Sequence, residues 1–269
     1  MNALLPWVEM WVLCFGLYGA AKLLTLADLA TDRRPRSDGR LTAYLLLWVG
    51  MDARGFLDRG RPVSRPQRAE WIYALGYTLL GLVLTWGVAR ECVTVSPLLA
   101  GWVGMTGGIL CMHFGTFHLL SLVWRKAGVD AAPLMRSPQR ATSLSTFWGE
   151  RWNHAFHQLV VRHVFRPLGR RFGALAALWA GFLVSGLIHD LVISVPARAG
   201  YGLPTLYFLL QALGVTAERT SITHKLGLGR GGRGWMFTML CVVAPAGLLF
   251  HEPFVGRVML PFLHFLRAL

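Results

Sequence analysis

Two short stretches of this sequence place polar side chains that could take part in catalysis among apolar ones. The first, "FLVSGLIHDL" (182–191), sets His189 beside Asp190 inside a long apolar run. The second, "SLSTFWGERWNHAFH" (143–157), combines aromatic residues with Asn153 and an adjacent acidic and basic pair. An ionisable side chain inside a membrane is costly and marks a functional site by default. Neutral imidazole is also the usual general base for taking a proton from a hydroxyl group.

Each stretch also has a purely structural explanation. A single histidine inside a membrane span can be neutral and hydrogen-bonded to a neighbouring helix. Trp148 and Trp152 are four residues apart, so on a helix they share one face and can anchor the segment at headgroup depth. Such anchoring does not explain why Arg151 and Asn153 lie between and beside the two indoles.

Helices must bring these side chains together, because Asn153 precedes His189 by 36 residues. That separation accommodates an interfacial helix over about 154–166, a turn within "RPLGRRFG" (166–173) and the span that carries His189. We therefore expect the aromatic segment to anchor a helix on the cytoplasmic side. This helix would re-enter the membrane and present Asn153 to the chamber of His189.

The composition is that of a membrane protein. Of the 269 residues, 54% are hydrophobic and 15% are charged, whereas soluble domains carry about 25% charged residues. The mean hydropathy is +0.47. Runs long enough to cross a bilayer predict an all-α polytopic bundle of about 6–8 transmembrane helices in one domain over 1–269. These runs are 3–29, 71–89, 97–124, 172–195, 203–217 and 234–250.

Two further runs, 41–51 and 254–266, are short. The first has eleven residues, too few to span as a helix, and is expected to be re-entrant or interfacial. The small residues of "GWVGMTGG" (101–108), including Gly104 and Gly108, predict close helix packing. The first long run lacks a basic leader, so we expect it to be retained as a span.

The basic residues predict the orientation in the membrane. The segments 30–70, 125–171 and 218–233 hold 22 of the 27 Lys and Arg residues, which places them in the cytoplasm by the positive-inside rule. The net charge of +14 therefore reflects topology and contact with anionic headgroups. Nucleic-acid binding is not expected. A multi-pass protein of a bacterial plasma membrane is the expected setting.

The sequence offers little for metal, nucleotide or hydrolase chemistry. The four cysteines are scattered without a CxxC pair, so neither a disulfide framework nor a cysteine metal site is expected. The histidines lack the clustered boxes of a di-iron enzyme, and we predict no metal. "GLGRGG" (227–232) does not follow a strand, and no GxSxG occurs.

In order and spacing, the two polar stretches resemble the membrane-bound O-acyltransferases, in particular the wax-synthase-like branch. That branch typically shows Ser…Phe-Trp-Gly-x-Arg-Trp-Asn and then Ser-Gly-x-x-His-Glu in a membrane helix. "YFLLQALGVTAER" (207–219) resembles the segment that follows, and "LLLWVGMDARGFLD" (45–58) is similar to its N-terminal region. The family-like region covers about 143–221. The resemblance implies a multi-helix bundle with an internal catalytic tunnel.

Carried onto this sequence, the resemblance makes His189 the catalytic histidine and Asn153 the active-site asparagine. Supporting roles fall on Trp148, Arg151, Trp152, Ser185 and Asp190. The sequence departs from the pattern at Asp190, where glutamate usually follows the histidine. Aspartate keeps the charge but is one methylene shorter, which leaves its hydrogen bonds open.

The implied reaction moves an acyl group from acyl-coenzyme A, as a co-substrate, to the hydroxyl of a lipophilic alcohol, without a bound cofactor or an acyl-enzyme. His189 would act as general base, and Asn153 would donate an amide N–H to a reactant or to the developing oxyanion. The coenzyme A phosphates would favour basic residues on the cytoplasmic face. The candidates are Arg140, Arg162 and Arg166, with Arg151.

Two other functions stay open at this point. A relay O-acetyltransferase for an extracytoplasmic glycan would need soluble partners. A transporter or non-catalytic scaffold predicts paired inverted repeats, which this sequence lacks. The acyl length, the acceptor alcohol and the oligomeric state are not encoded in a recognisable motif.

Overall fold

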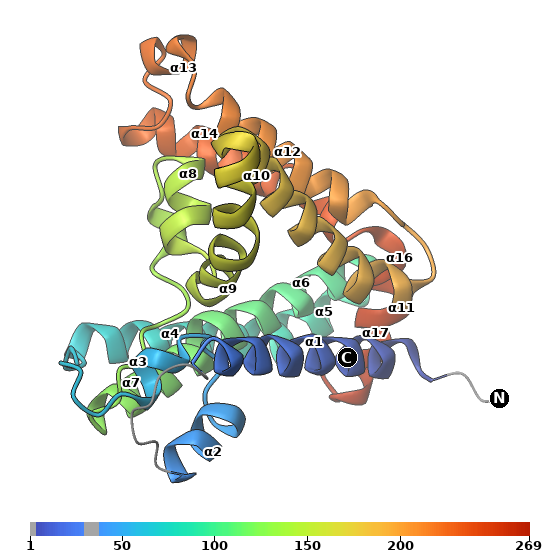
Figure 1. The fold of residues 1–269 in the computed structure, drawn as a ribbon. Coiled ribbons are helices and arrows are strands. Elements are labelled where there is room, and N and C mark those ends of the chain that lie inside the picture. Colours follow the sequence, from blue (N-terminus) through green and yellow to red (C-terminus); the bar gives the residue numbers. More distant parts are fainter. Residues whose placement is uncertain (1–3, 30–37) are drawn as a thin grey trace. The chain divides into compact units, whose positions relative to one another are not determined.

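The computed structural model describes residues 4–29 and 38–269, which form helices and loops without a β-strand (Figure 1). The chain divides into two compact units. Unit 1 contains residues 1–15 and 136–266, and unit 2 contains residues 16–135 and 267–269. Helix α1 (Pro6–Ala27) begins in unit 1 and ends in unit 2. The single catalytic domain expected over 1–269 stays a prediction.

Five helical stretches of the described residues are long and apolar enough to cross a membrane. A further apolar helix, α12 (Leu203–Ala217), has 15 residues and extends about 22 Å at the usual rise of an α-helix. These elements confirm the predicted fold class, an all-α multi-pass membrane protein. The five stretches are Pro6–Ala27, Arg68–Cys92, Pro97–Lys126, His154–Ala197 and Gly231–Leu249.

The stretch His154–Ala197 is two helices joined at a sharp break. Its 44 residues would extend about 66 Å as one straight helix, roughly twice the hydrocarbon core. Gly173 interrupts it with φ 86° and ψ 163°, a conformation open to glycine but strained for other residues. The break confirms a turn within 166–173, although the preceding helix continues past the predicted end at 166. The segments are α9 (His154–Val160), η5 (Val161–Phe165), α10 (Arg166–His189), η6 (Asp190–Ser194) and α11 (Val195–Ala197).

The short run 41–51 is not a continuous helix. Helix α2 (Asp38–Leu46) ends inside it, and α3 (Ala53–Leu57) begins after an irregular segment. The buried Lys22 of α1 ties this segment down, because its Nζ donates to the carbonyls of Tyr44 at 2.9 Å and Gly50 at 2.6 Å. The ammonium also lies 3.6 Å from the centre of the Tyr44 ring, a favourable cation–π distance.

Unit 2 contains a helical hairpin whose two arms approach closely. A Cβ added at Gly107 would lie 2.4 Å from Thr85 Oγ1, and one added at Gly81 would lie 2.5 Å from the backbone nitrogen of Cys111. Close packing is therefore confirmed at Gly107 and Gly81, and also at Gly104, which is buried and whose carbonyl accepts from Thr85 Oγ1 at 3.2 Å. A Cβ added at Gly108 would meet nothing within 4 Å. The arms are α4 (Arg68–Val83), η1 (Leu84–Val88) and α5 (Ala89–Cys92), then α6 (Pro97–Ile109), η2 (Leu110–Thr116) and α7 (Phe117–Lys126).

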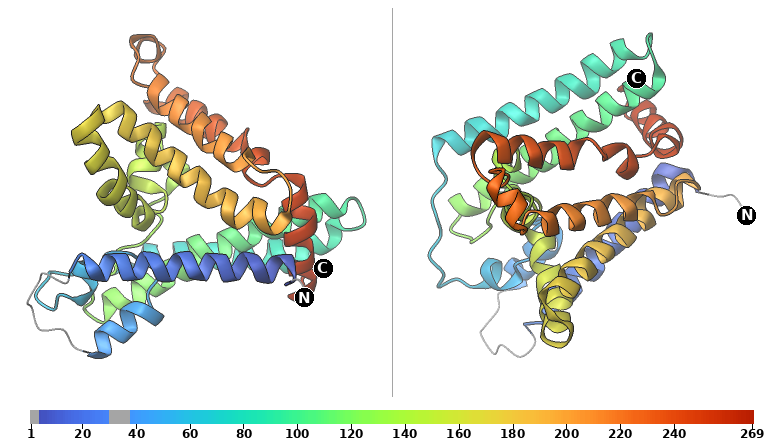
Figure 2. Two further views of the ribbon diagram at one scale, coloured as in Figure 1. Left: turned by 45° about the vertical axis from the view of Figure 1, so that its right-hand side comes forward. Right: turned by 90° about the horizontal axis from the view of Figure 1, so that it is seen from above.

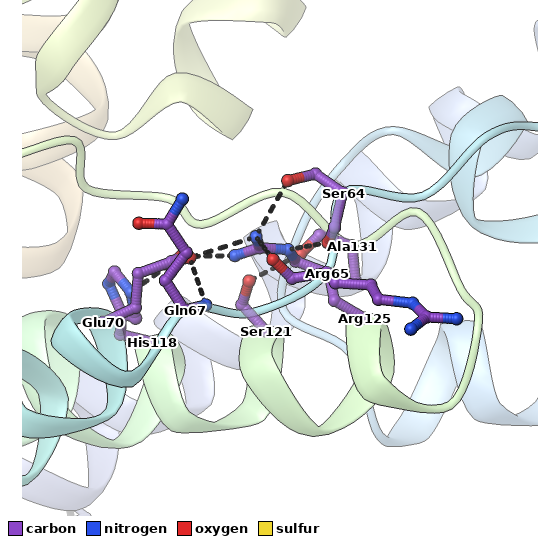
Figure 3. Close-up of polar contacts among 8 residues, drawn as sticks. All are labelled: Ser64, Arg65, Gln67, Glu70, His118, Ser121, Arg125 and Ala131. Atoms are coloured by element: carbon purple, nitrogen blue, oxygen red, sulfur yellow. Dashed lines mark hydrogen bonds and ion pairs between the residues drawn. The ribbon is translucent and has the colours of Figure 1, made fainter.

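A buried arginine closes the hairpin at its open end (Figure 3). Arg125 donates to Glu70 through both terminal nitrogens, at 2.5 and 3.2 Å, and its Nε donates to the carbonyl of Ser64 at 2.9 Å. Glu70 lies in the first turn of α4 and Arg125 in the last turn of α7. Each charge therefore also complements the dipole of its own helix.

In unit 1, α10 runs alongside α12, as both views of Figure 2 show. A small apolar core forms from Leu144, Leu178, Ala212 and Val215. It joins the aromatic segment to the two helices that hold the candidate site. Unit 1 also contains η3 (Pro138–Arg140), α8 (Leu144–Thr146), η4 (Phe147–Arg151), α13 (Ser221–Lys225), α14 (Gly231–Val243), α15 (Ala246–Leu249), α16 (Glu252–Phe254), η7 (Val255–Met259) and α17 (Leu260–Phe265).

The predicted orientation can be tested by labelling single cysteines in a variant that lacks the native four. Ala132, in the basic segment 125–171, and Tyr201, in a turn with few charges, are both exposed. We expect an impermeant thiol reagent added outside intact cells to label Tyr201→Cys and not Ala132→Cys. Permeabilisation should make both reactive. Labelling of Ala132→Cys in intact cells would overturn the positive-inside assignment.

Candidate active site

His189 is the last residue of α10, immediately before the π-helical turn η6. Its Nδ1 lies 2.7 Å from the backbone carbonyl oxygen of Ser185. A carbonyl can only accept, so Nδ1 carries the proton and the neutral ring has its lone pair on Nε2. The ring also packs on Phe208 of α12, with centroids 4.5 Å apart. The imidazole is thus fixed in one tautomer that leaves Nε2 basic.

Ser185 supports His189 through its backbone and not through its hydroxyl. The carbonyl of Ser185 accepts the His189 proton, while Ser185 Oγ donates to the carbonyl of Gly181 at 2.9 Å. This back-bonding of a hydroxyl to the preceding turn is a common way for serine to satisfy itself inside a helix. The predicted supporting role of Ser185 therefore depends on its backbone carbonyl. Another residue that keeps the helix intact could fill this role.

Asp190 caps helix α12 instead of contacting the imidazole through a hydrogen bond. Its carboxylate accepts from the backbone N–H of Gly202 at 2.8 Å and of Thr205 at 3.1 Å. The hydroxyls of Thr205 and Ser194 also donate to it. Gly202 is the N-cap residue and has no side chain to cap with, so Asp190 supplies the missing acceptor from another helix.

The aromatic segment reaches His189 through a series of ring contacts. Trp152 lies edge-on to Trp148, with centroids 6.3 Å apart, and Trp148 packs 5.6 Å from Phe208. Phe208 in turn touches the His189 ring. Trp148 Nε1 also donates to Gln211 of α12 at 3.2 Å. The two tryptophans therefore belong to the packing around His189, beyond any role as membrane anchors.

Asn153 is held in a strained conformation at the start of α9. Its backbone is left-handed, with φ 40° and ψ 60°, and its Oδ1 accepts from the backbone N–H of Phe156 at 3.2 Å. Asparagine suits this position, because it tolerates the left-handed region and is among the best N-caps. The cap uses only the oxygen of the amide. Nδ2 carries the N–H donors that a role toward substrate requires.

Arg151 fastens a loop. Its Nη1 donates to the carbonyls of Arg136 at 3.0 Å and Ser137 at 3.3 Å. The backbone adds to this clamp, since the N–H of Arg136 donates to the carbonyl of Arg151 at 2.8 Å. Nη1 is thus engaged with the backbone of this loop, and contact of Arg151 with the phosphates of coenzyme A stays a prediction.

The other arginines suggested for phosphate contact lie at the surface. Arg140 belongs to η3, whereas Arg162 and Arg166 are four residues apart on the helix before the Gly173 break. All three are exposed. Residues four apart share one face of a helix. Arg162 and Arg166 therefore form a pair on one face, and Arg140 is contributed by a separate loop.

Sequence reasoning missed several residues that organise this site. Glu218 is buried and caps α8, because its carboxylate accepts from the backbone N–H of Leu144 and of Ser145. Ser194 and His251 form a hydrogen-bonded chain to Asp190. Only His251 left a signal in the sequence, as a second histidine followed by an acidic residue at the end of an apolar run.

The fold and the site together define a helical multi-pass membrane protein with a histidine positioned within one span. Residues 131–210 match the membrane bound O-acyl transferase family. That segment contains Asn153 and His189 along with the aromatic residues between α8 and α9. The match confirms the resemblance to this family.

Several plant proteins are similar to the chain. A long-chain-alcohol O-fatty-acyltransferase of Simmondsia chinensis is 30% identical over 160 residues, which are 53% of this chain and 45% of the relative. Probable long-chain-alcohol O-fatty-acyltransferase 7 of Arabidopsis thaliana is 33% identical over 139 residues, 46% and 40% of the two chains. Diacylglycerol O-acyltransferase 1-1 of Oryza sativa subsp. japonica is 31% identical over 91 residues, 33% and 17% of the two chains.

These similarities agree with the wax-synthase-like branch suggested by the sequence. The chain spans about half or less of the length of these relatives.

Proposed function

We propose that this protein transfers a fatty acyl group from acyl-coenzyme A to the hydroxyl of a long-chain alcohol. The observation that carries the proposal is the tautomer of His189, which places a basic Nε2 inside a segment of the acyltransferase family. The fatty acyl and long-chain specificity is drawn from the names of the similar plant proteins. A membrane enzyme of this kind meets the alcohol and the acyl chain in the bilayer and the coenzyme A phosphates at its surface.

The reaction would proceed by direct attack. His189 Nε2 takes the proton of the alcohol as its oxygen attacks the thioester carbonyl, and a carbon–oxygen bond forms. An amide N–H of Asn153 stabilises the oxyanion of the tetrahedral intermediate. The carbon–sulfur bond then breaks, the ester leaves, and the proton held by His189 passes to the thiolate of coenzyme A. In this scheme the imidazolium is the only charge that the protein gains during the transfer.

The aromatic and polar neighbours hold this geometry in the proposal. Trp148 and Trp152 support the Phe208 face of the imidazole, Ser185 fixes its tautomer, and Arg151 holds the loop before the aromatic segment. Arg140, Arg162 and Arg166 would meet the phosphates of the donor. Replacing these three by glutamine should then raise the KM for acyl-coenzyme A with little change in turnover, since phosphate contacts serve ground-state binding.

The direct test is an assay of the purified protein in vesicles with fatty acyl-coenzyme A and a panel of alcohols. Long-chain alcohols should yield ester and free coenzyme A thiol in equal amounts. Thiol release without ester would indicate a hydrolase. Transfer of acetyl groups to a glycan acceptor, with no ester from alcohols, would favour the relay function. The bacterial plasma membrane stays an expectation, because the similar proteins are of plant origin.

We also predict that transfer needs no metal ion. No group of three or more His, Cys, Asp and Glu side chains that could hold a metal occurs among residues 4–29 and 38–269, and the proposed base is an imidazole. Ester formation should survive prolonged treatment with a chelator, and the treated protein should contain no stoichiometric metal. Activity lost to the chelator and restored by zinc or iron would contradict this prediction.

A further inference from the structure

His251, Ser194 and Asp190 are linked by hydrogen bonds although His251 lies 57 residues after Ser194. His251 is 3% exposed and Ser194 is fully buried. The Nδ1 of His251 accepts from the backbone N–H of Phe254 at 3.2 Å and so caps α16. An accepting nitrogen has no proton, so the neutral ring carries its proton on Nε2. Nε2 lies 3.2 Å from Ser194 Oγ and donates to it.

The hydroxyl of Ser194 continues the series with a hydrogen bond to the Asp190 carboxylate. Ser194 Oγ lies 2.9 Å from Asp190 Oδ1 and 3.2 Å from the carbonyl oxygen of Gly200. One hydroxyl has one proton, and the charged, nearer acceptor binds it more strongly. The direction is therefore fixed from His251 through Ser194 to Asp190.

These three residue types are those of a hydrolase triad, but the order of donation differs. In that triad histidine accepts the proton of serine, and the carboxylate accepts from histidine. Here histidine donates to serine, and serine donates to the carboxylate. Ser194 is therefore not activated as a nucleophile. The chain instead holds groups in place.

The surroundings of His251 favour the neutral imidazole that this series of hydrogen bonds requires. Burial lowers the pKa of His251 below its usual value, and the nearby Asp190 carboxylate opposes this only in part. A loop also closes over the ring. A Cβ added at Gly200, where φ is 72°, would lie 2.4 Å from His251 Nε2. Only glycine lets the backbone approach the imidazole this closely while adopting a left-handed conformation.

Asp190 connects the hydrogen-bond series of His251 and Ser194 to His189 in two ways. It is the next residue after His189, so its placement affects the last turn of α10. It also caps α12 through Gly202 and Thr205, and α12 carries the Phe208 ring that packs on His189. A shift of the carboxylate would thus move both the imidazole and the ring that supports it.

We propose that Ser194 and His251 are positioning residues for His189, acting through Asp190. The proposal rests on the proposed function of His189. Neither residue contacts the reacting atoms in this scheme. Their effect is to hold the imidazole where its Nε2 can meet the alcohol, and a displacement of about 1 Å at such a group can cost up to about 10²-fold in rate.

The test uses the full-length protein in vesicles, with Ser194→Ala and His251→Asn compared to Ser121→Ala. Asparagine keeps an acceptor for the Phe254 N–H but is too short to replace Nε2. Ser121 is a matched control, because it is fully buried and its hydroxyl donates to the carbonyl of Ala131 in unit 2. We expect turnover to fall about 10- to 100-fold in the first two variants, with the KM for acyl-coenzyme A nearly unchanged. Ser121→Ala should keep wild-type turnover.

A double-mutant cycle separates positioning from general damage. If Ser194 acts through Asp190, Ser194→Ala combined with Asp190→Asn should lose little more turnover than Asp190→Asn alone. Hydrogen exchange should also become faster at the amides of Gly202 and Thr205 in Ser194→Ala and His251→Asn, and stay unchanged in Ser121→Ala. Additive losses in the cycle, or unchanged exchange at these amides, would overturn the inference.

Wild-type turnover in Ser194→Ala, in a protein whose His189→Ala variant is inactive, would overturn the positioning role alone. A wild-type protein that forms no ester from any alcohol would overturn the proposed function and the positioning role with it.

Discussion

Replacing His189 with alanine should lower ester formation by about 10²–10⁴-fold, the usual contribution of a general base, while the protein still folds and inserts. The imidazole is the group that takes the alcohol proton in the proposed reaction. Its neighbours are held by other contacts, such as the cap that Asp190 provides for α12. The measurement is turnover per folded protein, with membrane abundance determined separately.

The control for this variant is His264→Ala. His264 lies exposed on α17, so its loss removes an imidazole without touching the site. We expect this variant to retain wild-type turnover. If His189→Ala turns over at nearly the wild-type rate at equal abundance, His189 has no part in the mechanism. Its Nε2 is then not the general base.

Asn153→Ala should lower turnover by roughly 10²–10³-fold, the scale found when one oxyanion donor is removed. Binding of acyl-coenzyme A should change little, since the interaction is made mainly in the transition state. Alanine also removes the N-cap of α9 and must adopt the left-handed conformation at this position. Lost capping costs about 1 kcal/mol, so the abundance of folded protein should fall as well.

Two further variants separate the donor from the cap. Asn153→Asp keeps the capping oxygen but lacks the N–H donor, and Asn153→Gly relieves the left-handed strain but has no side chain. Both should fold better than Asn153→Ala and still be slow. By contrast, Trp152→Ala removes the ring that stacks on Phe147 and should mainly reduce the folded amount. If the asparagine variants lose only abundance and keep turnover, Asn153 is a helix cap and nothing more.

Much of the fold was predictable because membrane helices are encoded locally. A run of about 20 apolar residues is both necessary and nearly sufficient for a span, and each long apolar run corresponds to a helix. The turn before the span of His189 was also predictable, since glycine and proline punctuate helices. The position of the break at Gly173 was not, because Pro167 and Gly169 offered alternatives within the same eight residues. The backbone of Gly173 decides it.

The details of the site depend on partners that are distant in sequence. Asp190 lies beside His189 and was given a supporting role with its hydrogen bonds left open, and the structure shows its carboxylate accepting from Gly202 and Thr205. Arg151, a candidate for phosphate contact, also donates through Nη1 to backbone carbonyls of the preceding loop. Such contacts leave no periodic pattern in the amino-acid sequence. They arise because helix ends and loops leave backbone groups without partners inside their own element, and a charged side chain from elsewhere in the chain supplies the partner.

The ion pair between Glu70 and Arg125 has a consequence for biogenesis. The two residues are 55 positions apart, so the acidic end of the first arm leaves the ribosome well before its partner. Both charges lie where the basic segments 30–70 and 125–171 meet the hairpin. The open end of the hairpin stays unfastened until the guanidinium reaches the carboxylate, since a buried charge without its partner destabilises the fold. The arms of this hairpin should therefore integrate as one paired unit. A nascent chain truncated before Arg125 should remain accessible to extraction from the membrane, and one extended past it should resist.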